Sequence, residues 1–249
     1  MRLAIISDIH EDILALEKVF RQIRKKGCDL LACLGDISGA GSSMYEDPVR
    51  RNAPACLDLI RANCDIVLPG NHDMHAAERF PQYDIGFVFP AEWYTLDISS
   101  REKKSLGKVW LHDEDLDPGY TTDSIEYLRS LPEFAIIDAG PFNVLLSHYI
   151  YPDLAGFLSG FRIEGTEFRH HFNFMERQDC RVAFHGHSHP DGFTLTRPGS
   201  FTIKDYGSMK LEPLPWIVGV PPVTGFRQRT GFCIFDTSAT TAEFIKVGV

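Results

Sequence analysis

Short apolar runs alternate with amphipathic stretches in the first third of the chain. Residues 3–7 and 30–34 are apolar runs of strand length, and residues 12–26 between them carry apolar side chains at helical spacing. This pattern predicts a strand, a helix and a second strand. A helical stretch at 54–62 and an apolar run at 66–68 extend the alternation. Strands that alternate with helices favour an α/β fold with a mainly parallel sheet.

The rest of the chain follows other patterns. The segment at about 76–123 is rich in aromatic and charged side chains and has weak periodicity, so we interpret it as an insertion or lid within a single domain spanning residues 1–249. Helices are predicted at 124–131 and 165–179. Short apolar runs separated by Gly and Pro indicate further strands at 134–138, 143–146, 181–184, 193–196, 200–203, 216–220, 232–235 and 242–247. We expect this C-terminal third to be antiparallel.

Charge and composition narrow the function classes. The 249 residues carry a formal net charge of −9, and no basic face of the kind that binds nucleic acid is evident. No apolar run is long enough to span a membrane, and the N-terminal run is too short for a signal peptide. None of the six cysteines forms a CxxC pair, so we expect free thiols in a reducing compartment and a cytoplasmic protein.

Polar residues that suit metal ligation follow several of the predicted strands. Five clusters have this position: Asp8-Ile9-His10, Gly35-Asp36, Gly70-Asn71-His72-Asp73, Ser147-His148 and His185-Gly186-His187-Ser188-His189. The carboxyl ends of strands in an open α/β sheet border one crevice, so the clusters can share one site. Asp, Asn and His offer oxygen and nitrogen donors that suit Mn, Fe or Zn. The sequence therefore predicts a metal site without sulfur ligands.

Each cluster alone has a simpler explanation. Asn and Asp after Gly are ordinary turn formers, and a lone His148 is more often a hydrogen-bonded structural residue. It is the joint order and the strand context that favour a metal site. Outside the clusters, His75, His112, His170 and His171 are expected to be solvated or bonded locally. His170 and His171 are adjacent on a predicted helix and cannot both face one ion.

The order Asp-x-His, Gly-Asp, Gly-Asn-His-Asp, His and Gly-His-x-His resembles the calcineurin-like metallophosphoesterase superfamily, and the stretch 218–235 resembles its small bacterial phosphodiesterases. The resemblance covers nearly the whole chain except about 76–123. It implies a four-layer α-β-β-α sandwich with two mixed β-sheets. It also implies two divalent metal ions (Mn, Fe or Zn). The ligands would be Asp8, His10, Asp36 and His189 for one ion, and Asp36, Asn71, His148 and His187 for the other.

The resemblance also implies a catalytic pair. His72 would face the substrate, and Asp73 would accept a hydrogen bond from its ring and orient it. The sequence departs from relatives at Glu11-Asp12, where Gly-Asn is frequent, which predicts added acidity near the metals. Ala40 stands where the protein Ser/Thr phosphatases carry an Arg. This difference weakens the interpretation of the chain as an enzyme like those phosphatases. His185 is an additional histidine that we expect to support the ligands or the fold.

The expected activity is hydrolysis of a phosphodiester or phosphomonoester. A metal-bridging hydroxide would attack phosphorus, and His72 would assist the leaving group. The alternatives are a catalytically weak metal-binding scaffold and an enzyme like the protein Ser/Thr phosphatases. The partner would be a small phosphoester. It would be nucleotide-like if Trp93, Tyr94 and Trp110 stack on it, although a small separate apolar core is the simpler role for these rings.

Overall fold

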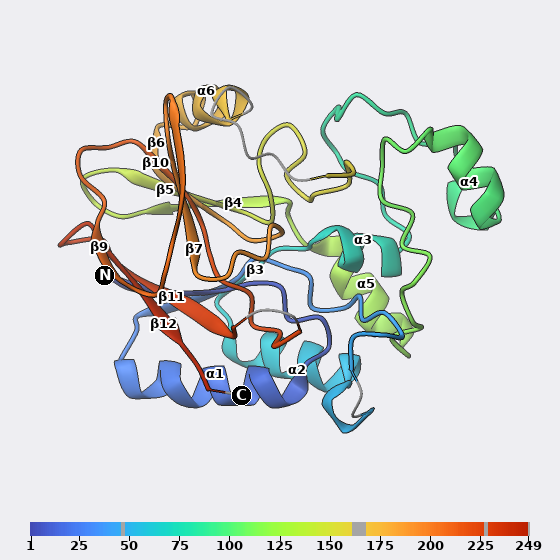
Figure 1. Cartoon of the computed structure of the whole chain (residues 1–249), viewed down its shortest axis with the longest axis horizontal. Coiled ribbons are helices and arrows are strands. Elements are labelled where there is room, and N and C mark those ends of the chain that lie inside the picture. The colour runs from blue at the N-terminus through green and yellow to red at the C-terminus, as the bar shows by residue number, and fades with distance from the viewer. Residues whose placement is uncertain (46–47, 161–167, 227–228, 249) are drawn as a thin grey trace.

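Two mixed β-sheets lie face to face, with helices on their outer sides (Figure 1). The computed structural model describes residues 1–45, 48–160, 168–226 and 229–248. In Figure 1, α1 and α2 cover the outer face of one sheet and α6 lies on the outer face of the other. This is the four-layer α-β-β-α arrangement that the family resemblance implies.

The first sheet carries the three N-terminal strands. Its order is β3-β2-β1-β11-β12-β9. The bounds are Arg2–Ile6 for β1, Leu30–Cys33 for β2, Ile66–Val67 for β3, Gly207–Lys210 for β9, Gly231–Asp236 for β11 and Thr241–Lys246 for β12. Strands β1, β2 and β3 are parallel, and the other pairings are antiparallel. The prediction of a mainly parallel sheet therefore holds only for the N-terminal half of this sheet, and β9 was not predicted.

The second sheet has the order β4-β5-β6-β10-β7-β8. The bounds are Phe134–Asp138 for β4, Asn143–Ser147 for β5, Cys180–His185 for β6, Phe193–Arg197 for β7, Ser200–Lys204 for β8 and Trp216–Gly219 for β10. The expectation that the C-terminal third is antiparallel is wrong for β10, which pairs parallel to β6 and antiparallel to β7. All four residues of β10 are buried, as suits a strand in the interior of a sheet.

The helices are short apart from the first two. Their bounds are Ile13–Lys26 for α1, Ala53–Asn63 for α2, Asn71–Ala76 for α3, Ile98–Ser105 for α4, Thr122–Ser130 for α5 and Arg169–Arg177 for α6, with 3₁₀ turns at Pro48–Arg50 and Trp93–Thr95. Asp12 caps α1 by accepting from Ala15 N, and left-handed Gly27 ends it. The helix predicted at 165–179 begins at Arg169 among the described residues, and 165–167 lie outside them.

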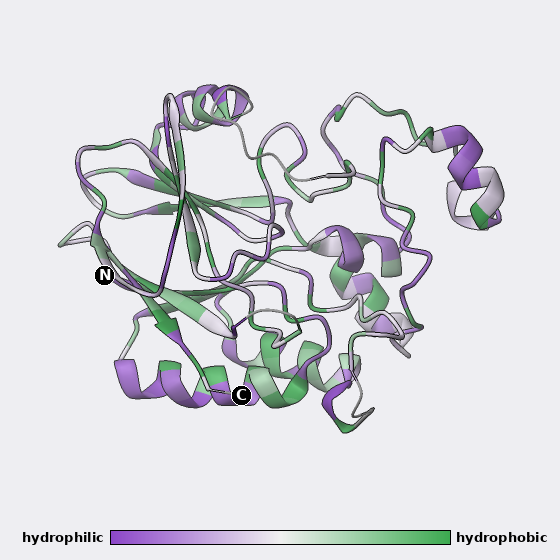
Figure 2. Ribbon diagram, in the orientation of Figure 1, coloured by the Kyte–Doolittle hydropathy of each residue, from purple (hydrophilic) through white to green (hydrophobic). Residues whose placement is uncertain are grey.

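Alternation along the strands separates the layers. In β1, Leu3 and Ile5 belong to the core between the two sheets, whereas Ala4 and Ile6 face the core beneath α1 and α2. A third cluster joins α6 to the outer face of the second sheet. In Figure 2 the strands of both sheets are largely hydrophobic, whereas α1 also carries hydrophilic residues. The strand ends are thereby held rigidly between packed layers.

The segment at about 76–123 forms a fourth apolar cluster with residues of α3 and of the loop after β5. Trp110 N donates to Phe157 O at 2.9 Å, and Leu116 N donates to Ala40 O at 3.0 Å. The first bond joins the segment to the loop after β5, and the second joins its end to the loop after β2. All six cysteines are free, as expected. Within the described ranges, no helix combines the length and apolarity needed to cross a membrane.

Candidate metal centre

The predicted ligands come together at one edge of the two sheets. Asp8 follows β1, Asp36 follows β2 and Asn71 begins α3 after β3. His148 directly follows β5, and His187 and His189 lie in the loop after β6. We call these seven residues the strand-end cluster: Asp8, His10, Asp36, Asn71, His148, His187 and His189. Parallel neighbours β1, β2 and β3 end at the same sheet edge, which explains how motifs distant in sequence meet.

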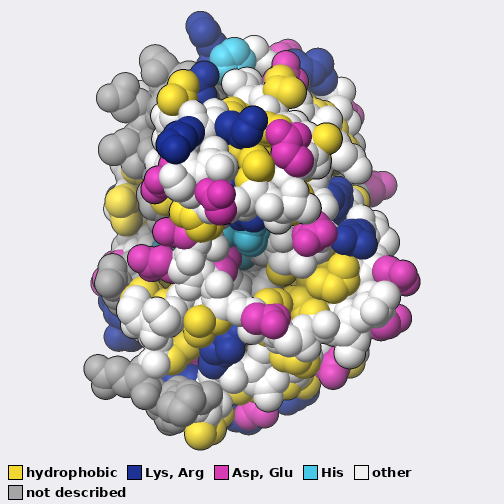
Figure 3. Space-filling model, turned by 90° about the vertical axis from the view of Figure 1, so that its right-hand side faces the viewer, with side chains coloured by type: hydrophobic (Ala, Val, Ile, Leu, Met, Phe, Trp, Pro, Cys, Tyr) yellow, Lys and Arg dark blue, Asp and Glu magenta, His cyan; other side chains and the backbone are white. Residues whose placement is uncertain are grey.

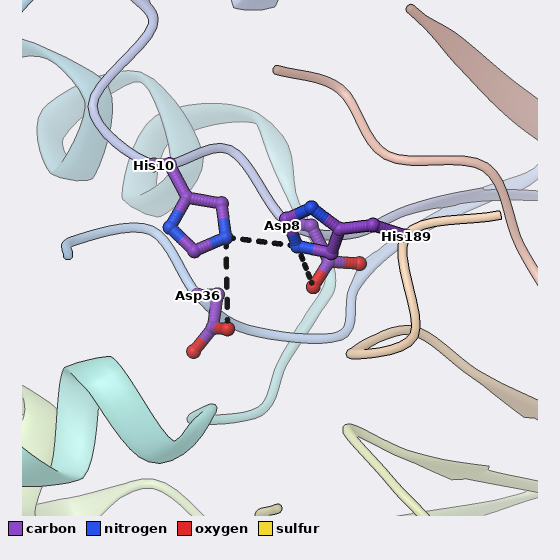
Figure 4. A group of neighbouring side chains, drawn as sticks. All are labelled: Asp8, His10, Asp36 and His189. Carbon is purple, nitrogen blue, oxygen red and sulfur yellow. Dashed lines mark hydrogen bonds and ion pairs between the residues drawn. The ribbon is translucent and has the colours of Figure 1, made fainter. Parts of the chain in front are cut away.

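One group within the cluster contains Asp8, His10, Asp36 and His189, whose donor atoms all lie within 4.8 Å of one another. His10 Nε2 and His189 Nε2 are 3.0 Å apart, and His189 Nε2 is 3.2 Å from Asp8 Oδ1 (Figure 4). His10 Nε2 lies 3.8 Å from Asp36 Oδ2. Ring nitrogens and carboxylate oxygens that converge in this way form a donor set suited to a divalent transition metal.

A second group contains Asp36, His148 and His187, again with donor atoms within 4.8 Å of one another. His148 Nε2 lies 3.2 Å from Asp36 Oδ2. Nearby, Asn71 Oδ1 is buried and has no hydrogen-bond partner within the described structure. A buried amide oxygen without a partner is costly, and a bound cation would satisfy it. Asp36 belongs to both groups, so the residues present fit a pair of metal ions.

Backbone carbonyls fix the orientation of two ligand histidines. His10 Nδ1 lies 2.9 Å from Gly39 O, and His148 Nδ1 lies 2.8 Å from Leu34 O. Since a carbonyl only accepts, each ring donates through Nδ1 and, when neutral, keeps a lone pair on Nε2. Both Nε2 atoms point into the strand-end cluster, so the rings are oriented for ligation.

Several members of the cluster have strained backbone. Positive φ angles occur at Asp8 (58°), His10 (47°), Asp36 (52°), His187 (64°) and His189 (43°). This left-handed region is unfavourable for residues other than Gly, and such strain concentrates at functional sites. Gly39 is also required sterically, because a Cβ there would overlap the His72 ring. The backbone of these loops therefore adopts an unfavourable conformation that positions the side chains of the cluster.

The ionisable groups of the cluster perturb one another. Burial alone would raise the pKa of Asp8, but the His189 imidazole lowers it to about 2. Burial would likewise raise the pKa of Asp36, but His148 leads the groups that hold it well below its usual value. Burial would lower the pKa of His148, but Asp36 raises it to about 9. Burial lowers the pKa of His10 to about 4. Asp8 and Asp36 are thus held ionised, as ligation requires.

His72 stands beside the cluster and pairs with a residue that was not predicted. Its Nδ1 lies 2.6 Å from Asp115 Oδ2, so the ring donates to that carboxylate. Burial would lower the pKa of His72, but the carboxylates of Asp36 and Asp115 raise it to about 9. Asp115 lies in the 76–123 segment, where the sequence offered no motif. Asp113 and Glu114 precede it, so nothing in the sequence distinguishes Asp115 from the acidic residues beside it.

Asp73 has a different role from the expected one. Its carboxylate accepts from the N–H groups of Ile37 (3.0 Å), Ser38 (2.9 Å) and Gly70 (3.1 Å) and from Ser38 Oγ (2.7 Å). The expectation that Asp73 orients the His72 ring is therefore wrong, because those donors occupy its carboxylate and Asp115 pairs with the ring. Asp73 instead ties the loop after β2 to the start of α3.

The acidity expected from Glu11-Asp12 is largely neutralised. The buried Glu11 carboxylate pairs with Arg51 Nε at 2.6 Å and accepts from Gly39 N at 3.2 Å. Asp12 pairs with Arg50 Nη2 at 2.5 Å. Burial raises the pKa of Glu11. These two ion pairs fix the loop that carries His10, and nothing in the local sequence indicated that Arg50 and Arg51 would reach it.

A cavity of about 600 Å³ opens onto the cluster. In the face shown in Figure 3, a histidine side chain is visible in a hollow, with Asp and Glu side chains around it. Besides site histidines and Asp36, the cavity is lined by Met44, Asn71, Trp110, Leu111, Asp113, Glu114, Asp115, Ser188 and Phe226. Of the three aromatic rings suggested for stacking, Trp110 lines this cavity. Trp93 is buried in the fourth apolar cluster, and the Tyr94 ring stacks on Phe80.

The remaining histidines divide into two kinds. His171 accepts from Tyr151 N at 2.8 Å, so it is bonded locally as expected. His185 Nδ1 lies 2.9 Å from Gly186 O, which is also a local bond. His112 is also bonded locally, but its partners are His72 and Asp115. The His75 ring stacks on His112 with centroids 4.5 Å apart. Nothing in the sequence indicated that His75 and His112 would lie beside His72.

Comparison with known proteins agrees with this geometry. A model of the calcineurin-like phosphoesterase family matches residues 1–191, and the chain belongs to this family. An uncharacterised protein of Methanocaldococcus jannaschii is 42% identical over 257 residues, which cover 98% of this chain and 86% of that protein.

Solved structures share the fold at low sequence identity. A metallophosphoesterase from Sphaerobacter thermophilus superposes with a TM-score of 0.68 at 21% identity, covering 100% of this chain and 88% of the other. A hypothetical protein from Pyrococcus horikoshii gives a TM-score of 0.63 at 15% identity, covering 99% and 87%. The architecture is therefore that of a metallophosphoesterase, and the candidate metal-binding groups lie at its strand ends.

Proposed function

We propose that the chain hydrolyses phosphoesters at a centre of two divalent metal ions (Mn, Fe or Zn). The observation that carries this proposal is the position of Asp36, whose carboxylate belongs to two donor groups at once. One ion would be held by Asp8, His10, Asp36 and His189. The other would be held by Asp36, Asn71, His148 and His187. A shared carboxylate is the arrangement expected for a bridged pair.

The ions and the protein contribute different chemistry. Two bound cations would neutralise charge on the phosphoryl oxygens and lower the pKa of a bound water. The chain itself supplies rigid placement, since the ligands follow strands fixed between packed layers. The 76–123 segment serves as an insertion in the single domain and walls one side of the cavity with Trp110 and the residues that follow it.

His72 is the proposed acid for the leaving group. Its Nδ1 is engaged by Asp115, which leaves Nε2 to donate a proton to the leaving oxygen. The carboxylates of Asp36 and Asp115 raise its pKa, which favours the protonated ring. Asp115 stabilises this imidazolium and holds the ring plane, so it acts as a positioning residue. Asp73 contributes indirectly by fixing the loops around Asp36 and His72.

The cavity favours a phosphodiester over a phosphomonoester. Trp110, Met44 and Phe226 provide apolar surface, and Asp113 and Glu114 add negative charge. Of the described lining residues, none is Lys or Arg. A diester carries one negative charge and a second organic group, whereas a monoester dianion is repelled more strongly. An aromatic or nucleoside group on the substrate could stack on Trp110. The free cysteines fit a cytoplasmic location.

Hydrolysis of bis-p-nitrophenyl phosphate and p-nitrophenyl phosphate by the Mn²⁺-loaded protein tests this proposal. We expect turnover of both, with the higher kcat/KM for the diester. His72→Ala should keep its metal content and lose about 10²–10⁴ in kcat. Full metal uptake without turnover of either ester, or of a panel of nucleotides and cyclic nucleotides, would identify a metal-binding scaffold instead. A His72→Ala variant with unchanged kcat would remove His72 from the reaction.

A further inference from the structure

A third group of metal-type donors lies beside the strand-end cluster. It consists of His72, His112 and Asp115, whose donor atoms also lie within 4.8 Å of one another. The three atoms are His72 Nδ1, His112 Nδ1 and Asp115 Oδ2. Their separations are 2.6 Å between His72 and Asp115, 3.3 Å between the two histidines, and 3.4 Å between His112 and Asp115.

These separations approach those around a tetrahedral ion. With ligand distances of about 2.0–2.1 Å, neighbouring donors of a tetrahedral Zn²⁺ lie about 3.3–3.4 Å apart. Both distances to His112 Nδ1 have this value. The third distance is shorter because a hydrogen bond joins His72 to Asp115. An ion that replaced the shared proton would need this one pair to separate by about 0.7 Å.

The surroundings hold the group in place and leave it accessible. The His112 side chain is 2% exposed, and its ring is stacked at 22° on His75. The backbone of His112 has φ 57°, the same strained region that the strand-end cluster uses. All three residues line the cavity of about 600 Å³, from which an ion could enter. A water or substrate oxygen could complete the fourth position.

We propose that His72, His112 and Asp115 form a third cation site that takes Zn²⁺ and inhibits the enzyme when filled. Two imidazole nitrogens and one carboxylate are a donor set that Zn²⁺ binds more strongly than Mn²⁺ does. Filling the site occupies Nδ1 of His72 and breaks its bond to Asp115. The binding part of this proposal is independent of the proposed function, whereas the inhibition rests on it.

Equilibrium Zn²⁺ binding to the full chain tests the site directly. His112→Phe removes one donor in a region already packed with aromatic rings, and we expect it to bind one zinc fewer than the unmodified protein. His112→Leu provides a second variant if Phe does not fit. His170→Asn is the matched control, because it removes an exposed histidine on α6 and should leave the zinc count unchanged. Equal zinc counts in the unmodified protein and the folded His112 variants would overturn the proposal.

A zinc titration of the Mn²⁺-loaded enzyme tests the inhibition. His112→Phe removes one ligand of this site, so half inhibition of the variant's own basal rate should need at least tenfold more Zn²⁺ than half inhibition of the unmodified protein. Identical inhibition of both proteins would overturn the inhibitory role. If the variant binds one zinc fewer but the unmodified protein hydrolyses no ester, the third cation site is supported and the proposed function is rejected. The two failures are therefore distinguishable.

Discussion

Replacing Asp115 with Asn tests whether the Asp115 carboxylate raises the pKa of His72, the proposed acid for the leaving group. The substitution keeps the size of the side chain and removes the negative charge 2.6 Å from His72 Nδ1. A hydrogen bond to a charged group contributes about 1.5–3 kcal/mol, and one pKa unit corresponds to about 1.4 kcal/mol. The pKa of His72, which is raised to about 9, should therefore fall by about 1–2 units.

The consequence for the rate depends on pH in a defined direction. A histidine with a raised pKa loses its proton as pH rises through that value, so the acid-competent form disappears on the alkaline side. At a pH above the raised value, a fall of about 1–2 units lowers the protonated fraction about 10- to 100-fold, whereas at pH 6 the fraction hardly changes. The alkaline limb of the kcat profile should move to lower pH by about 1–2 units in Asp115→Asn.

The assay is the pH dependence of kcat for a diester with Mn²⁺ present, measured on both proteins. Asp113→Asn is the matched control, because Asp113 also lines the cavity, has the same charge and lies two residues away. It should leave the alkaline limb in place. If the alkaline limb of the kcat profile does not move in Asp115→Asn, or moves equally in both variants, Asp115 does not set the pKa of His72.

Three further predictions concern residues around the candidate metal centre. Asp73→Ala leaves several buried donors without a partner; it should cost about 3 kcal/mol of unfolding free energy and lower Tm by about 10 °C, measured by thermal denaturation. A change below about 1 kcal/mol would show that the loops do not depend on it. Trp110→Ala should raise KM for diesters with an aromatic group more than for small alkyl diesters, and equal effects would exclude stacking. Arg51→Met leaves the buried Glu11 carboxylate unpaired and should lower stability by about 3–5 kcal/mol. The loss should shrink as pH falls, because burial raises the pKa of Glu11 and favours its protonated form.

Sequence reasoning predicted most of the strands and the residues that gather at the site because both signals are local. Asp8 and Asp36 stand directly after short apolar runs, and strand-end geometry brings such residues to one edge whatever separates them along the chain. The structure brings together all the residues expected to be ligands. The direction of β10 could not be predicted in this way. A buried apolar run suits a parallel or an antiparallel strand equally, and long-range packing determines which strands lie beside it.

The residues around His72 could not be found in the same way. Asp115 and His112 lie in a segment without periodicity, where an acid or a histidine is ordinarily solvated. They reach His72 because the aromatic cluster around Trp93 folds the segment back onto the loop after β2. The assignment of Asp73 went wrong for a related reason: adjacency in sequence does not tell whether a side chain turns to its neighbour's ring or to nearby backbone N–H groups.

The central claim is that Asp36 joins two cations, and the electron paramagnetic resonance of the Mn²⁺-loaded protein tests it most directly. Ions about 3.5–4 Å apart should give a spin-coupled spectrum with two tightly held Mn²⁺ per chain. Asp36→Asn should lose the coupling and at least one ion, whereas Asp113→Asn should keep both. A single uncoupled Mn²⁺ in the unmodified protein, or a coupled pair that survives Asp36→Asn, would contradict the account.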